Sequence, residues 1–229
     1  MKINGLSILV TDVLLAAITL RLAWGLLLEA RRLKDRAIAL WCGGFCAVAG
    51  SVVLGGIWRV FSASLDADWA PLLRTGTMVL PTLAGLLFLL GVLHGYSGGR
   101  LRAIVAAVAV AKFALFSLWI AVNDNFSLVV YDSVLTMFVV IILCTWGAWV
   151  QRTPSAPWVL AGLLVSMVGA LFQQGRVSIH PHFDHNDLYH VIQIAAMYFL
   201  YRGGLLLRDL EPVPIDLEAT QQLPIVGEE

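Results

Sequence analysis

Charged residues are scarce in this chain. Only 13% of its 229 residues are charged and 59% are hydrophobic, whereas soluble domains have roughly 25% charged residues. No soluble core of matching size would bury such an apolar excess, so an ordinary soluble fold is excluded and a bilayer is the expected solvent. The formal net charge is zero, so no overall positive field favours binding to nucleic acid.

Cysteine is almost as rare. The chain has three cysteines, all inside apolar segments, so no disulfide framework is expected. Cys42 and Cys46 are four residues apart on one predicted helix, a spacing that suits a soft metal. We interpret them instead as small buried hydrophobic side chains.

Long apolar segments dominate the rest of the sequence. Each is near the roughly 20 residues that span a bilayer core, and they predict an all-α, polytopic bundle of seven transmembrane helices over residues 1–208. No loop is long enough to hold a soluble domain. Residues 209–229 are acidic and contain three prolines, which predicts a disordered cytoplasmic tail. The predicted helices are 5–28, 38–60, 77–96, 101–122, 127–150, 157–174 and 187–207.

Lysine and arginine are distributed unevenly between the two ends of these helices. Nine flank one side of the predicted membrane and four the other, and the positive-inside rule then places the N-terminus outside and the C-terminus in the cytoplasm. We expect a multi-pass protein of a bacterial inner membrane, in contact with membrane lipid. The nine are Arg31, Arg32, Lys34, Arg36, Arg100, Arg102, Arg152, Arg202 and Arg208; the four are Lys2, Arg59, Arg74 and Arg176.

Most groups capable of chemistry lie at the start of the seventh segment. Four of the five histidines fall within residues 180–190. Asp187 and His190 are three residues apart and share one helix face, and ionisable groups at membrane depth indicate function by default. Imidazole and carboxylate suit zinc, so His185, Asp187 and His190 are candidate metal ligands, with Asp132 of the fifth segment nearby. The alternative is a structural network in which these groups pair with Arg59 and Arg176.

The second segment carries small residues at every fourth position: Gly43, Ala47, Ser51 and Gly55. This spacing lets helices approach closely in a bilayer. Arg59 continues the series, which predicts that it faces the bundle and pairs with a carboxylate. The alternative is that its long side chain reaches the outer headgroups.

Lys112 lies near the middle of the fourth segment and needs a carboxylate partner, either Asp12 or Asp132. A buried lysine among seven helices also suggests retinal. Retinal proteins carry that lysine on the last helix, where this chain has none, so we reject retinal.

The sequence Leu188-Tyr189-His190-Val191 resembles the start of the last helix in the CREST superfamily, the seven-pass proteins that include alkaline ceramidases and progestin/adiponectin receptors. That helix opens with His-x-x-x-His, and a Ser-x-x-x-His in the second helix and an aspartate in the third complete a zinc site. Here Asn186 stands at the first histidine, with His185 one residue earlier, and Gly55-x-x-x-Arg59 replaces the second-helix motif. The His-Asn-Asp-Leu-Tyr-His motif is closer to that of uncharacterised bacterial seven-pass families.

The resemblance implies a zinc-dependent membrane hydrolase of lipid amides or esters. His185, Asp187 and His190 would hold the metal, Asp132 would act as general base or further ligand, and Arg59 would stabilise the oxyanion. The alternative is a receptor or scaffold of seven helices, without turnover, whose polar cluster is structural.

Overall fold

Seven α-helices account for nearly all of the described chain, and the all-helical prediction is confirmed. The computed structural model describes residues 3–62, 64, 69–180 and 183–210; in these ranges there is no strand, only an isolated bridge between His180 and Phe183. The helices are α1 (Ile3–Leu33), α2 (Arg36–Phe61), α3 (Trp69–Tyr96), α4 (Gly99–Asn123), α5 (Phe126–Trp149), α6 (Ala156–Gln174) and α7 (His185–Leu206).

Two helices, α1 and α3, exceed the apolar segments that predict them by more than one turn. α1 continues to Leu33, so only Lys34 and Asp35 connect it to α2. Lys34 makes the turn between the two helices with a left-handed φ of 55°. α3 begins at Trp69, eight residues before the predicted start at 77. Its first turn contains Pro71. The backbone N–H groups of a first turn have no acceptor within the helix, so proline, which lacks this N–H, costs no hydrogen bond there. Polar residues therefore extend helices beyond the apolar spans.

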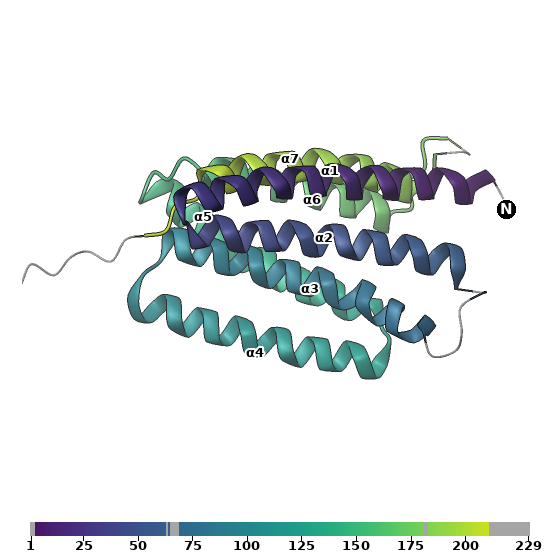
Figure 1. Ribbon diagram of the computed structural model, residues 1–229, viewed down its shortest axis with the longest axis horizontal. Coiled ribbons are helices and arrows are strands. Elements are labelled where there is room, and N and C mark those ends of the chain that lie inside the picture. The colour runs from purple at the N-terminus through teal and green to yellow at the C-terminus, as the bar shows by residue number, and fades with distance from the viewer. Residues whose placement is uncertain (1–2, 63, 65–68, 181–182, 211–229) are drawn as a thin grey trace, which may run out of the picture.

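Six of the helices form a closed ring. Each of α1, α2, α3, α5, α6 and α7 contacts the next, and α7 returns to α1. α4 packs outside this ring against α3 and α5, at the lower edge of the bundle in Figure 1. Neighbouring helices run in opposite directions where they follow one another in the chain, so the start of α1, the end of α2 and the start of α7 lie at one end.

The core is made of large apolar side chains on the inner faces of α2 and α3. Trp41 and Phe45 are fully buried and both contact the Phe88 ring. A Cβ on Gly91 would lie 3.1 Å from the Ala37 carbonyl oxygen, so glycine is needed for α2 and α3 to come this close. The small-residue series of α2 also faces α3, since Ser51 donates a hydrogen bond to the Thr77 carbonyl at 2.9 Å.

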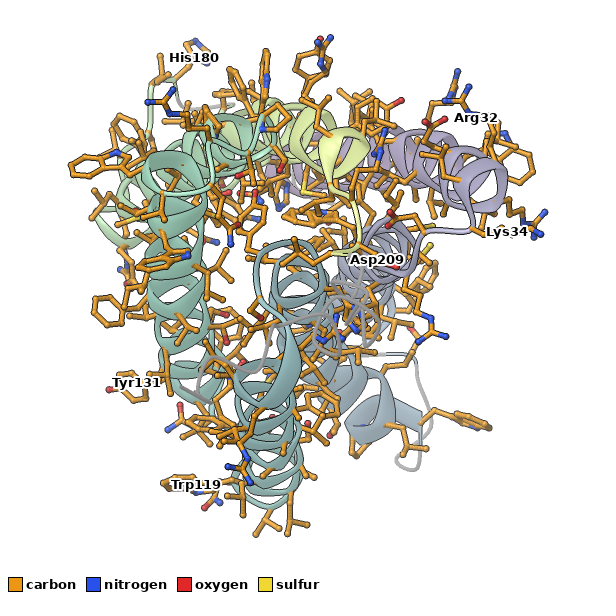
Figure 2. The ribbon with its side chains drawn as sticks, turned by 90° about the vertical axis from the view of Figure 1, so that its left-hand side faces the viewer. Arg32, Lys34, Trp119, Tyr131, His180 and Asp209 are labelled. Atoms are coloured by element: carbon orange, nitrogen blue, oxygen red, sulfur yellow. The ribbon has the colours of Figure 1, made fainter. Side chains whose placement is uncertain are left out.

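The outer surface of the bundle is apolar as well. Side chains such as Leu115, Trp119 and Phe138 are more than half exposed, and Figure 2 shows Trp119 and Tyr131 pointing away from the helices. Within the described residues, six helices are long and apolar enough to cross a membrane; α7 is not one of them, because polar residues lower its hydropathy. The chain is therefore a helical protein whose surface suits a bilayer.

The chain beyond α7 is held at the start of α2. Asp209 accepts hydrogen bonds from the backbone N–H groups of Arg36 and Ala37, each at 2.9 Å. Its own N–H donates to Asp35, the N-cap of α2. The acidic tail predicted from the sequence begins at Asp209, and its residues 211–229 lie outside the described residues.

Candidate functional site

Five polar side chains meet between three helices at the end of the bundle that holds the start of α7. They come from α1 (Thr11 and Asp12), α2 (Arg59) and α7 (Asp187 and His190), and we call them the Arg59 cluster. Asp12, Asp187 and His190 are 3%, 0% and 5% exposed. Polar groups this buried are stable only when they satisfy one another.

The first turn of α7 fixes the position of Asp187. Asp184 is the N-cap, and its Oδ1 accepts the backbone N–H groups of Asn186 at 2.8 Å and Asp187 at 3.1 Å. In return, Asp187 Oδ2 accepts the Asp184 N–H at 3.3 Å. This reciprocal capping box leaves Asp187 Oδ1 to accept the Thr11 hydroxyl at 2.9 Å. Asp187 therefore both starts the helix and ties α7 to α1.

Arg59 pairs with Asp12 across the gap between α2 and α1. Its Nη2 lies 2.9 Å from Asp12 Oδ1 and 2.7 Å from Oδ2, while its Nε donates to the Gly55 carbonyl at 3.3 Å. The Asp12 side chain is 4% exposed and that of Arg59 is 36% exposed. The predicted pairing of Arg59 with a buried carboxylate is thus present, and the partner is Asp12.

His190 is oriented by the same carboxylate. Its Nδ1 lies 3.2 Å from Asp12 Oδ1 and 3.2 Å from Thr11 Oγ1. Asp12, ionised opposite Arg59, can only accept hydrogen bonds, and Thr11 donates to Asp187, so we assign the proton to Nδ1. His190 therefore points into the bundle, as predicted from its helix face, and Nδ1 serves as a donor in the cluster.

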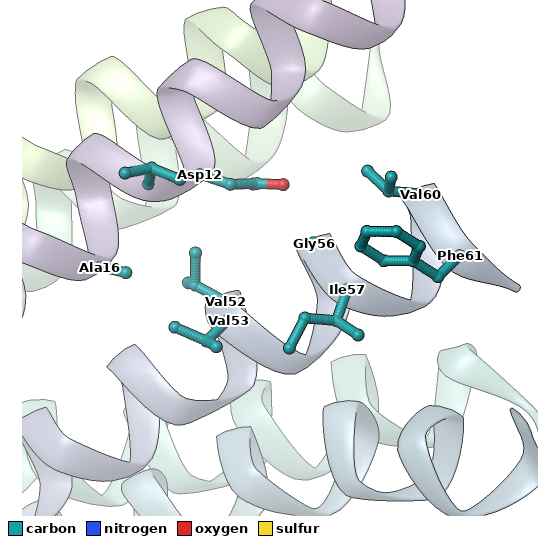
Figure 3. A pocket seen from close by; sticks show the side chains of 9 residues that line it. Asp12, Ala16, Val52, Val53, Gly56, Ile57, Val60 and Phe61 are labelled. Atoms are coloured by element: carbon teal, nitrogen blue, oxygen red, sulfur yellow. The ribbon is translucent and has the colours of Figure 1, made fainter. Parts of the chain in front are cut away.

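An apolar groove adjoins the Arg59 cluster between α1 and α2. Its volume is about 180 Å³, and the Asp12 carboxylate points into it (Figure 3). Every other lining side chain is apolar, and several, including Val53 and Phe61, are exposed at the surface of the bundle. The lining residues are Asp12, Val13, Ala16, Val52, Val53, Gly56, Ile57, Val60 and Phe61.

Asp132 is not part of this cluster. It is buried on α5, which contacts α3, α4 and α6 and, in the described chain, neither α1 nor α7. Its carboxylate pairs with Lys112 of α4, which also donates to Thr136 at 2.7 Å. Asp132 is therefore the partner that Lys112 requires, one of the two expected from the sequence. α6 separates α5 from α7 in the ring, so Asp132 lies away from His190.

His185 stays outside the cluster too. It is the first residue of α7, half-buried, and it makes no hydrogen bond or ion pair among the described residues. In the same part of the chain, no three His, Cys, Asp or Glu side chains are grouped so as to hold a metal ion. Asn186, at the position where the resemblance has a histidine, accepts a hydrogen bond from Gln173 at 3.2 Å. A zinc site of His185, Asp187 and His190 has no support in this geometry.

Thr11 is the member of the cluster that sequence reasoning did not single out. A threonine in an apolar helix is common, and its hydroxyl often bonds its own backbone. The available signal was its neighbour Asp12, the only carboxylate in the apolar part of α1.

Comparison with known proteins gives one match. The model of a family of unknown function, DUF6962, matches residues 7–209, which include every member of the Arg59 cluster. No curated protein and no solved structure matches the chain.

Proposed function

The chain belongs to DUF6962, and on the geometry of its Arg59 cluster we propose that it is a seven-pass membrane protein that binds an amphiphile from the bilayer. The binding site is the groove beside Asp12, and the protein acts as a receptor or scaffold without turnover. Arg59 contacts the polar head of the ligand, and the apolar walls contact its chain.

The membrane assignment extends the six apolar helices to all seven. α7 has 22 residues and is about 33 Å long, enough to span the hydrocarbon core of about 30 Å. Its polar residues Asp187 and His190 face the bundle, so they lower its hydropathy without contacting lipid. The excess of arginine and lysine at the opposite end, including the exposed Arg32 and Lys34 in Figure 2, supports an outer N-terminus. Reporter fusions test this orientation: cytoplasmic activity at residue 178 would overturn it.

The observation that carries the binding proposal is the unfinished hydrogen bonding of Arg59. Nε and Nη2 are used by Gly55 and Asp12, whereas Nη1 makes no hydrogen bond within the described residues. The side chain is 36% exposed, so a ligand oxygen can reach those two N–H donors. Arg59 is not itself a wall of the groove, but it pairs with Asp12, which is. A guanidinium with free donors next to the carboxylate that lines an apolar groove suits a molecule with a carbonyl, carboxylate or phosphate head and a hydrocarbon chain.

The donor set fits zinc poorly. Arg59 already supplies the positive charge opposite Asp12, and a metal ion at that carboxylate would stand within a few ångströms of the guanidinium. Nδ1 of His190 carries a proton and contacts Asp12, so that nitrogen is not a ligand. Accordingly, no step of the proposed function uses a metal.

Native mass spectrometry of the full chain, purified in mild detergent, tests both the binding of an amphiphile in the groove and the poor fit to zinc. The parent protein should retain a bound amphiphile, and Val53→Phe should lose it because the new ring fills the groove. Val108→Phe is the matched control, an equally conservative change at an exposed position of α4, and should retain it. Equal retention by both variants would refute the groove. Near-stoichiometric zinc in the parent that disappears in His190→Ala would instead support the hydrolase.

A further inference from the structure

A second groove lies at the other end of the bundle. It has a volume of about 440 Å³ and lies between the first turns of α2 and the last turns of α3. Arg36 and Arg59 are 23 positions apart on α2, so the two sites are about 34 Å apart along that helix. We call it the Arg36 groove, after the cation at its rim. Its lining residues are Arg36, Ala39, Leu40, Gly43, Leu87 and His94.

The polar and apolar linings of this groove are separated along the helix axis. Arg36 and His94 belong to the end of the bundle, whereas Leu40, Gly43 and Leu87 lie up to two turns deeper. Seven positions of α2 cover about 10 Å, enough to pass through a headgroup region of roughly 5–8 Å and reach the hydrocarbon. The groove thus has a cationic mouth and a hydrocarbon-like floor.

The acids near the mouth keep their negative charge, but in the described chain none of their oxygens bonds the Arg36 guanidinium. Asp35 and Asp209 are both close, but their four carboxylate oxygens accept backbone N–H groups at 2.9 Å, from Ile38 and Asp209 and from Arg36 and Ala37. His94 Nδ1 is 3.6 Å from Asp209 Oδ1. The Arg36 guanidinium makes no ion pair or side-chain hydrogen bond in the described chain. It is therefore available to an anion from outside the protein.

We propose that the Arg36 groove holds one anionic phospholipid of the adjoining leaflet, with its phosphate at Arg36 and His94 and the start of an acyl chain along Leu40, Gly43 and Leu87. The inference rests on the chain spanning a membrane, as proposed above, and concerns a site separate from the Arg59 cluster. A free phosphate ion would contact only the mouth and would leave the apolar floor of the groove without a partner. A lipid satisfies both parts, and the neighbouring Arg31, Arg32 and Lys34 raise the local concentration of anionic lipid.

Lipid binding to the full chain in detergent, measured by native mass spectrometry, tests the proposal. The parent should bind phosphatidylglycerol more tightly than phosphatidylcholine of the same acyl chains. Arg36→Gln should weaken phosphatidylglycerol binding by about tenfold, since it removes a charge-assisted hydrogen bond. Ala39→Phe should weaken both lipids: Ala39 lines the groove but is exposed, so the new ring fills the groove without entering the core.

The controls separate this site from general attraction and from the first groove. Arg100→Gln removes an exposed charge at the same end of the bundle and should leave binding unchanged. In a background of Val53→Phe, which blocks the groove at Asp12, Arg36→Gln should still weaken phosphatidylglycerol binding by about tenfold. The proposal is overturned if the parent binds both lipids equally, if Arg100→Gln weakens binding as much as Arg36→Gln, or if glycerol phosphate competes as well as the whole lipid.

Discussion

Removing Arg59 should cost more stability than removing its partner, although both changes break the same ion pair. In Arg59→Gln the Asp12 carboxylate, 4% exposed, keeps only the contact with His190 Nδ1 at 3.2 Å. Leaving a buried charge without its partner costs about 3–5 kcal/mol. Because His190 remains, we expect the lower end, about 3 kcal/mol.

Asp12→Asn instead leaves the Arg59 guanidinium without its carboxylate partner. Arg59 is 36% exposed and keeps its bond to the Gly55 carbonyl, and its long side chain can move toward the headgroups. The amide oxygen of the new Asn still accepts one hydrogen bond. The expected loss is therefore about 1 kcal/mol, the value of a single hydrogen bond. Asp124→Asn is the matched control, since its pair with Arg74 is at the surface and is worth less than about 1 kcal/mol.

Reversible unfolding in mixed micelles gives the three free energies of unfolding directly. The expected order of destabilisation is Arg59→Gln, then Asp12→Asn, then Asp124→Asn. A loss in Asp12→Asn equal to or greater than that in Arg59→Gln would refute the reasoning from unequal burial. Parent-like stability of Arg59→Gln would show that the pair is not desolvated.

Three further changes test the remaining polar contacts by the same measurement. Lys112→Met should cost about 3–5 kcal/mol, because Asp132 is 1% exposed and loses the only cation that it pairs with among the described residues; the double variant with Asp132→Leu should recover most of this, and a double variant as unstable as the single one would contradict the pairing. Thr11→Val should cost about 1 kcal/mol by removing the hydrogen bond from the hydroxyl to Asp187 Oδ1, whereas Thr11→Ser should be near the parent; equal losses would exclude the hydroxyl as the cause. Asp184→Ala should cost about 1 kcal/mol through loss of the N-cap of α7, and no loss would mean that Asp187 holds the first turn alone.

Apolar periodicity predicted the helices well because a long apolar run has no other stable form in a bilayer. Helix geometry also predicted that Asp187 and His190 share one inward face, since residues three positions apart on a helix point in nearly the same direction. It also placed Arg59 on the bundle side. Helix ends were less accurate: the turn at Lys34 and the first turn of α3 depend on backbone geometry that hydropathy does not register.

It was harder to predict which side chains of different helices contact one another than to predict which face of its helix each side chain occupies. Their positions in the sequence place Asp132 and His190 near the same end of the predicted bundle. The prediction that they lie close together came from this shared depth alone. Which helices touch depends on how the ring closes, and α6 lies between α5 and α7. Lys112 shows the same limit: the sequence required a carboxylate for it and left Asp12 and Asp132 as equal choices, which only the position of α4 outside the ring decides.

Arg59 changes what the motif at the start of α7 implies. In the superfamily that this motif resembles, a histidine at the corresponding place in the second helix binds zinc, and the metal supplies the positive charge that the carboxylates need. In this chain the guanidinium stands 2.7 Å from Asp12 and supplies that charge itself. His190 then contacts Asp12 through a proton-bearing nitrogen, and Asn186 bonds to Gln173 instead of a metal. The positive charge of this buried polar centre therefore comes from a side chain, which pairs with the one carboxylate that also lines the neighbouring groove.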